Sequence, residues 1–374
     1  MEIKGNLVDI IRREIYPAVI KINAGKIQSI NKSQHDCESY ILPGLIDSHI
    51  HIESSMLNPG SFARAAVSRG TTAVVSDPHE IANVLGIRGI DYMMDDASKV
   101  PLRFYFGAPS CVPATSFESS GAIINSEAVR ELLERPFVNY LSEMMNFPGV
   151  VYDDGEVLKK ISYAKQMGKP IDGHAPGLSG EALKKYISAG ISTDHECNTI
   201  EEAREKIQLG MKILIREGSA ARNLDALKDL FRTDPDMLML CSDDLHPEML
   251  VKGHIDRLLA MLISEGYDVF DVIRSCTLNP SIHYGIAAGL PEAGNPADLI
   301  LVDDLRSMKV NQTWINGIKV FDKGRVLFEY SGAKEINNFK SSKIKNDDIR
   351  MQATAGRLRV IEAYDGDLTT GESI

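Results

Sequence analysis

The chain has 374 residues, of which 44% are hydrophobic and 25% are charged, a composition typical of a globular protein with a substantial core. Its 41 basic and 52 acidic residues give a net charge of −11, which argues against nonspecific binding to nucleic acid or to an anionic membrane surface. The five cysteines show no CxxC spacing, so we expect reduced and mostly buried thiols. No signal peptide or long apolar run is evident, so we expect a cytoplasmic location and no membrane-spanning helix.

The first 40 residues read as short β-strands. Apolar and β-branched residues gather at 6–11, 18–23 and 26–30, and the turn residues Asn23-Ala24-Gly25-Lys26 separate the last two runs. We interpret residues 1–40 as one part of a small β domain.

From residue 41 the pattern changes to short apolar runs alternating with amphipathic stretches, as in repeated βαβ units. Helical patterns occupy, for example, 155–167, 179–189 and 199–208. Eight such units predict an α/β fold in which a (β/α)₈ TIM-like barrel spans residues 41–285. The alternative is a doubly wound open sheet. The eight strand candidates are 41–51, 71–77, 102–108, 137–143, 169–174, 190–195, 211–217 and 237–243.

Beyond residue 285 the β pattern returns, with hairpin signals at Asn316-Gly317 and Lys323-Gly324. We expect residues 286–332 to join the N-terminal segment and complete a small β-sandwich domain. Residues 333–350 are rich in Lys, Ser and Asn and read as a linker, and a strand pattern resumes at 357–364.

Reactive side chains stand at or just beyond the ends of the predicted barrel strands. Residues two apart on a strand share a side, so His49 and His51 can bind one ion together. The carboxyl ends of barrel strands converge on one mouth, where active sites form. Histidine and carboxylate ligands suit zinc, iron(II) or manganese(II). The residues in these positions are His49, His51, Asp77, His79, Glu143, His174, His195 and Asp243.

A shared carboxylate is needed to hold two ions together, and Glu143 is placed for that role. Such a pair lowers the pKa of a bridging water to roughly 7 and makes hydroxide at neutral pH. Asp243 is then placed to take the proton and deliver it to a leaving group. His35, His254 and His283 lie away from strand ends, and we expect them to be ordinary core or surface residues.

The segment 43–51, Pro-Gly-Leu-Ile-Asp-Ser-His-Ile-His, resembles the first-strand motif of the amidohydrolase superfamily. Other segments, in order along the chain, are similar to adenine deaminases. The resemblance runs from residue 41 to about 320. The similar segments are 52–55, 70–84, 172–178, 194–197, 216–223 and 242–247.

This resemblance implies hydrolytic deamination of adenine to hypoxanthine and ammonia, in purine salvage or adenine catabolism. It implies two divalent ions, with manganese(II) or iron(II) favoured over zinc, and a homo-oligomer. Hydantoinase-like relatives use a carboxylated lysine as the bridge, whereas the fourth strand here ends in Glu143, which favours the deaminase branch. The ligands carried over by position are His49, His51, Glu143, His174, His195 and Asp243.

Adenine deaminases of this type continue into a second large domain. We therefore expect residues 333–374 to be a linker and the stub of a truncated C-terminal domain, with 357–364 as its first strand.

The mechanistic hypothesis is that hydroxide attacks C6 of adenine while Asp243 moves a proton to the amine, with Glu143 and His195 also catalytic. Protonation of a ring nitrogen would prepare C6 for attack and needs an acid at the barrel mouth. Glu53, His79 and Glu80 are the alternative candidates for this acid. Ring hydrogen bonds are expected from Ser54, Ser55, Glu80, Arg216 and Asp244.

Two rival interpretations remain. One is another amidohydrolase acting on a cyclic amide or an acylated substrate. The other is an inactive, truncated barrel that serves as a scaffold.

Overall fold

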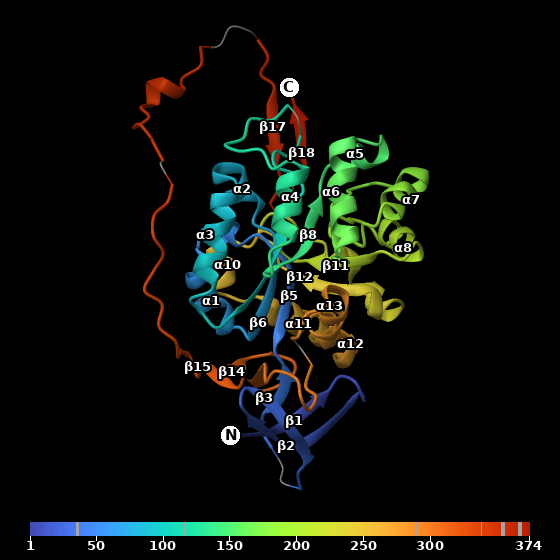
Figure 1. The fold of residues 1–374 in the computed structure, drawn as a ribbon, viewed down its shortest axis with the longest axis vertical. Coiled ribbons are helices and arrows are strands. Elements are labelled where there is room, and N and C mark those ends of the chain that lie inside the picture. The colour runs from blue at the N-terminus through green and yellow to red at the C-terminus, as the bar shows by residue number, and fades with distance from the viewer. Residues whose placement is uncertain (35–36, 116, 289, 338, 353–355, 366–368) are drawn as a thin grey trace.

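The computed structural model describes residues 1–34, 37–115, 117–288, 290–337, 339–352, 356–365 and 369–374, so His35 lies outside the described residues. Its central feature is a barrel of parallel strands surrounded by helices (Figure 1). All eight predicted strands are present, and each lies within or close to its predicted range. They are β5 (Leu45–Ile50), β6 (Thr71–Ser76), β7 (Arg103–Ala108), β8 (Val138–Met144), β9 (Ile171–Gly173), β10 (Thr193–Asp194), β11 (Lys212–Arg216) and β12 (Leu238–Cys241).

The barrel is assembled from two parallel sheets, β5-β6-β7-β8-β9 and β10-β11-β12. One seam is closed by the Ser192 amide, which donates to the Ile171 carbonyl at 2.9 Å. At the other seam Asp243 donates to the His49 carbonyl at 2.9 Å and accepts from the His51 amide at 3.3 Å. Since both seams are bonded, the strands form a closed barrel and not the open sheet considered as the alternative.

The helices follow the barrel strands and cover them. The predicted helices 155–167, 179–189 and 199–208 correspond to α6, α7 and α8. The full set is α1 (Pro59–Val67), α2 (His79–Leu85), α3 (Ile87–Ala97), α4 (Ser126–Leu133), α5 (Phe147–Val151), α6 (Gly155–Gln166), α7 (Gly180–Ser188), α8 (Ile200–Gln208), α9 (Leu224–Leu227), α10 (Pro247–Leu250), α11 (Ile255–Ser264), α12 (Val269–Ser275) and α13 (Leu278–Tyr284). None of the described helices has the length and apolar character needed to cross a membrane.

A composite sheet lies beyond the amino end of β5, as the returning β pattern predicts (Figure 1). The sheet folds over, because β3 exchanges backbone hydrogen bonds with residues 294–295 and Ile20, Ile27, Leu299 and Trp314 share one buried cluster. The predicted β-sandwich is thus formed by both ends of the barrel chain. Its strand order is β16 (Arg325–Val326), β15 (Ile318–Asp322), β14 (Val310–Ile315), β13 (Leu299–Val302), β4 (Tyr40–Pro43), β1 (Glu2–Asp9), β2 (Glu14–Asn23) and β3 (Lys26–Lys32).

The predicted first barrel strand, 41–51, is divided in the structure. Its beginning is β4, which pairs with β1 and β13 of the composite sheet, and only β5 enters the barrel. Gly44 separates the two, and a Cβ at this position would lie 2.2 Å from the Thr72 hydroxyl oxygen. The close approach explains why glycine stands at this junction.

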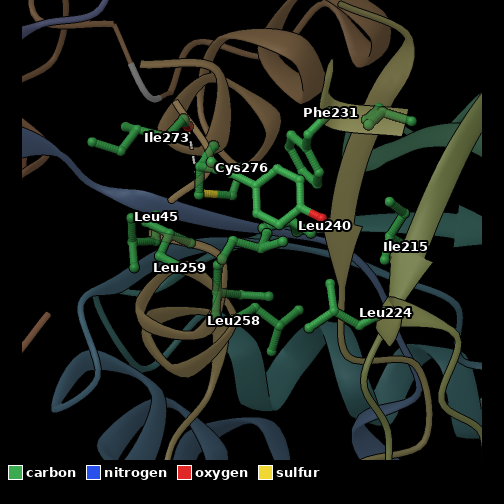
Figure 2. Close-up of a cluster of buried hydrophobic side chains, with 14 of the residues drawn as sticks. Leu45, Ile215, Leu224, Phe231, Leu240, Leu258, Leu259, Ile273 and Cys276 are labelled. Atoms are coloured by element: carbon green, nitrogen blue, oxygen red, sulfur yellow. Dashed lines mark hydrogen bonds between the residues drawn. The ribbon is translucent and has the colours of Figure 1, made fainter. Parts of the chain in front are cut away.

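The largest apolar cluster packs α11 and α12 against β5, β11 and β12 (Figure 2). Leu45, Ile215 and Leu240 come from the strands, and Leu258 and Ile273 come from the helices that face them. This burial fixes β5 and β12, which both end at the barrel mouth. Four of the five cysteines, Cys111, Cys197, Cys241 and Cys276, are buried as expected.

The described parts of the C-terminal segment run along one side of the barrel, include the short 3-10 helix η4 (Asn346–Ile349) and end in a hairpin (Figure 1). Its strands are β17 (Val360–Ala363), within the predicted range 357–364, and β18 (Thr370–Ser373). Leu358 and Ile361 are exposed there.

Candidate metal centre

Glu143 ends β8 and stands between two groups of histidines. Its Oε1 lies 3.4 Å from His51 Nε2 and 3.3 Å from His79 Nδ1. Its Oε2 lies 2.8 Å from His174 Nδ1 and 3.1 Å from His195 Nε2. Because each carboxylate oxygen faces a different pair of imidazoles, the side chain has the arrangement expected of a bridge between two cations.

A second group of ligating atoms forms around Asp243, which follows β12. Asp243 Oδ1 lies 3.7 Å from His49 Nε2 and 3.2 Å from His51 Nε2, and these two nitrogens are themselves 3.2 Å apart. Asp243 adopts a left-handed backbone conformation, with φ of 54°. Such strain is uncommon outside glycine and is concentrated at functional sites. The two seam hydrogen bonds to β5 hold this conformation in place.

Asp77 and His79 lie on the open side of this group. His79 Nδ1 is 3.0 Å from Asp77 Oδ2, and the Asp77 carbonyl lies 3.0 Å from His51 Nδ1. The four side chains His51, Asp77, His79 and Glu143 offer ligand atoms within 4.8 Å of one another. His79, expected as a catalytic residue, thus lies in contact with the candidate ligand Glu143, and Asp77 belongs to the same group.

Glu196 and Arg216 complete the wall beside His174 and His195. Glu196 Oε1 lies 3.4 Å from His174 Nδ1 and 3.2 Å from His195 Nε2. Arg216 binds both Glu196 oxygens, at 2.6 and 2.8 Å, and also donates to Asp243 Oδ2. The expected substrate contact Arg216 is therefore buried between two carboxylates, which it orients.

The histidines carry different charges in this environment. Burial, with the neighbouring rings of His195 and His51, lowers the pKa of His49 to about 3. Burial also disfavours charge on His51, but Glu80 and Asp243 outweigh it and raise the pKa of His51 well above its usual value. Burial likewise opposes ionisation of Glu143, yet His174 and His195 hold the pKa of Glu143 well below its usual range. A divalent ion binds imidazole in its neutral form, so metal binding beside these carboxylates would release the proton held by His51.

The mouth of the centre is lined by carboxyl groups. Burial, and then the nearby Glu80, raise the pKa of Glu53 to about 8. Its Oε1 accepts a bond from the Ile81 amide at 3.2 Å, whereas its Oε2 is buried without a hydrogen-bond partner among the described residues. Oε2 of Glu80 lies 3.4 Å from His51 Nδ1. The Ser54 hydroxyl donates to Asp244 Oδ1 at 2.5 Å. The Ser55 hydroxyl points elsewhere and donates to the Ile52 carbonyl at 2.6 Å, so its proton is already used.

Lys206 of α8 supports the loops that carry His174 and His195. Its buried Nζ donates to the Ala175 carbonyl at 2.8 Å, to Asp194 Oδ2 at 2.9 Å and to Glu202 Oε1 at 2.7 Å. Ala175 follows His174 directly, and Asp194 precedes His195. One ammonium group therefore ties together the two loops that follow β9 and β10.

The donor set fits divalent metal ions. His49, His195 and Asp243 form one group of ligand atoms within 4.8 Å, and Glu143, His174 and His195 form another. His49 Nδ1 and Asp77 Oδ1 are buried without a hydrogen-bond partner among the described residues. His49 Nε2 and His51 Nε2 also lie close together at 3.2 Å, and a cation that binds both nitrogens would account for this approach.

The six ligands expected from the sequence all lie in this one cluster. Sequence reasoning did not assign roles to Asp77, Glu196 or Lys206. Asp77 ends a predicted strand and is already among the residues placed at strand ends, although no role is assigned to it. Glu196 follows His195 directly, so its position next to a strand end could have found it. Lys206 lies in a predicted helix that is rich in charged residues, and nothing in the neighbouring sequence distinguishes it from a solvent-exposed lysine. His254 and His283, expected to be ordinary residues, lie outside the cluster.

Comparison with known proteins gives consistent matches. The model of the amidohydrolase family matches residues 40–320. An adenine deaminase of Methanosarcina barkeri is 53% identical over 380 residues, which cover 99% of this chain and 69% of that protein. An adenine deaminase of a Sulfurovum species is 51% identical and is matched over 70% of its length. A solved beta-aspartyl dipeptidase of Fervidobacterium islandicum shares the fold, with a TM-score of 0.64 over 88% of this chain and 98% of that one, at 15% identity.

Proposed function

This chain belongs to the amidohydrolase family, and within it to the adenine deaminases, and from this premise we propose that it hydrolyses adenine to hypoxanthine and ammonia at a centre of two divalent ions. The observation that carries the proposal is the position of Glu143, whose two oxygens face separate histidine pairs. In this assignment His49, His51 and Asp243 would hold one ion, His174 and His195 would hold the other, and Glu143 would be a ligand to both.

Bound divalent ions would lower the pKa of water to about 7 and so supply a nucleophile at neutral pH. Asp243 is the proton carrier of the proposal. Arg216 holds its Oδ2, which leaves Oδ1 directed toward the histidines and available to accept a proton. The proton comes from the water whose oxygen bonds to C6, and the same Asp243 oxygen would pass it to the exocyclic amine. The C6–N bond then breaks and the amine leaves as ammonia.

Recognition of the purine is assigned to the carboxyl groups at the mouth. Glu53 has a buried, unpartnered Oε2 and a raised pKa, so its protonated form is suited to donate to a ring nitrogen. Asp244 is held by Ser54, and burial raises the pKa of Asp244 as well. His79 is less suited to protonate the ring, because it already contacts Asp77 and Glu143.

Manganese(II) or iron(II) is the proposed metal, with zinc as the alternative. Homo-oligomerisation and a cytoplasmic location stay predictions. The proposal is tested by expressing the chain in manganese-supplemented, iron-depleted medium and assaying adenine loss, ammonia release and metal content on one sample. Turnover with close to two metal ions per chain supports it.

Two other results have distinct meanings. Bound metal without turnover of adenine contradicts the assigned substrate and leads to a screen of cyclic amides and acylated compounds. A chain that binds no metal when its ligand residues are intact contradicts the assigned centre itself.

A further inference from the structure

A basic groove lies where the barrel meets the composite sheet. Its volume is about 880 Å³. Its cationic residues come from the connections α1–β6, α10–α11, β13–β14 and β15–β16 and from the first turn of α11. The charged residues that line the groove are Arg69, Lys252, Arg257, Lys309, Lys323 and Asp256.

The charge of this groove is opposite to that of the whole chain. Five cations and one carboxylate line it, whereas the chain carries a net charge of −11. Arg69 lies 3.9 Å from Asp256, and Lys309 pairs with Asp303 at 3.4 Å. Within the described ranges, the side chains of Lys252, Arg257 and Lys323 form no hydrogen bond or ion pair. Three cations that share one groove without an ion-pair partner raise its electrostatic energy, and a bound anion would lower it.

Three of the residues that line the groove are apolar. They are Ala260, Val310 and Phe321, of which Phe321 is almost fully buried. Small-molecule sites have volumes of about 300–1,000 Å³ and combine an apolar lining with a few placed polar groups. The groove has a volume in this range, and charged and polar residues form most of its lining.

We propose that the basic groove binds a nucleoside diphosphate or triphosphate, with the phosphates on the cations and the nucleoside beside Ala260, Val310 and Phe321. Arginine and lysine are the side chains that bind phosphate oxygens most strongly. A long nucleic acid is disfavoured, because it would extend beyond the groove onto a surface of net negative charge. The site is distinct from the metal centre, since the composite sheet lies beyond the amino end of β5 and the metal centre at its carboxyl end (Figure 1).

The experiment is calorimetric titration of the metal-loaded wild-type chain with UDP and, separately, with inorganic pyrophosphate. UDP offers no purine amine, so it does not test the deaminase centre. Metal content is measured before and after titration to exclude removal of metal by the diphosphate. Binding of UDP that is tighter than that of pyrophosphate supports the proposal, and equal affinity overturns the nucleoside part of it.

The matched variants reverse two charges each. Arg257→Glu with Lys323→Glu removes two groove cations, and at least about tenfold weaker UDP binding is expected. Lys4→Glu with Lys26→Glu makes the same change in net charge on exposed strands of the composite sheet, and less than about twofold weakening is expected there. Absence of UDP binding by the wild type, or equal losses in both double variants, overturns the site. Circular dichroism confirms that each variant is folded.

Discussion

Histidine and aspartate occur in two settings within this barrel, and the settings differ in how completely their polar atoms are paired. Asp47 of β5 accepts from the Ser242 amide at 3.0 Å and lies 2.7 Å from His254 Nε2, while His254 Nδ1 lies 2.7 Å from the Thr71 hydroxyl. Both side chains are buried and every contact is complementary. At the carboxyl end of the same strand, His49 Nδ1 has no hydrogen-bond partner in the part of the chain that the structure describes, and His49 Nε2 lies 3.2 Å from His51 Nε2.

Buried histidine and aspartate thus occur both in the fold and in the candidate site, so residue type alone does not identify a functional site. The polar atoms of Asp47 and His254 are paired within the protein, and the pair stabilises the fold. In the cluster at the barrel mouth, by contrast, the ligating atoms are suited to bind added cations. Changes in the first setting should therefore cost stability, and changes in the second should cost metal binding or turnover.

The largest expected effect is that of Asp243→Asn on turnover. Asparagine tolerates the positive φ and keeps the shape, but it cannot carry the proton, so turnover should fall about 10³-fold. Steady-state assay of adenine deamination measures this, with thermal unfolding to show that the fold is kept. Near-normal turnover would remove Asp243 from the mechanism.

His254→Ala is the counterpart in the paired setting. It leaves Asp47 buried without its partner, so the free energy of unfolding should fall by about 3 kcal/mol. Metal content of the folded fraction should stay at the wild-type value. Urea unfolding and elemental analysis give the two readings. If metal were lost at unchanged stability, the division between the two settings would be wrong.

Glu143→Gln tests the bridge. The amide lacks the charge that two cations share, so metal content should fall from about two ions per chain to one or fewer, and turnover should fall with it. Elemental analysis across a manganese titration measures the stoichiometry. Two tightly held ions in this variant would contradict the bridging assignment.

Lys206→Met tests a residue that belongs partly to each setting. The ammonium group of Lys206 is fully paired, yet it supports the loops that carry His174 and His195. Partners of metal ligands typically contribute 10- to 100-fold in affinity, so manganese affinity should weaken by roughly that factor. The control is Lys169→Met at the amino end of β9, where Lys169 Nζ donates to the Leu133 and Val138 carbonyls. That variant should lose stability without losing metal affinity. Equal metal losses in both variants would assign Lys206 a purely structural role.

The sequence predicted the barrel and the six expected ligands for a physical reason. Strands of a parallel barrel end at one mouth, so residues distant in the chain are brought together by topology alone. What it did not predict depends on packing. Register shifts between Asp47 and Ile50 of β5 and between Leu141 and Met144 of β8 break simple alternation just before His51 and around Glu143. No period-two pattern contains such a bulge.

The supporting residues were missed for a related reason. Lys206 acquires its role only because α8 packs beneath two loops, and its sequence neighbours do not report that contact. The left-handed backbone of Asp243 is likewise imposed by the seam with β5 and not by its own residue type. Barrel topology therefore brings the ligands together, and the sequence shows their positions. Packing supplies the supporting contacts, and only the structure shows those.

The smallest expected effect concerns His283, a histidine outside the mouth. Burial, with nearby Lys212, lowers the pKa of His283 to about 4. The unfolded chain binds this proton near pH 6.5 and the folded chain does not, so stability is complete above that pH and declines as pH falls toward 4. The loss attributable to His283 between pH 7 and pH 5 is about 2 kcal/mol.

His283→Gln should remove this part of the pH dependence. Urea unfolding at pH 5 and pH 7 should show a smaller difference for the variant than for the wild type, because glutamine takes up no proton in the unfolded state. An unchanged difference would mean that other groups account for the acid sensitivity. Either way, turnover near neutral pH should be retained, since His283 is neutral there and lies outside the metal-ligand groups.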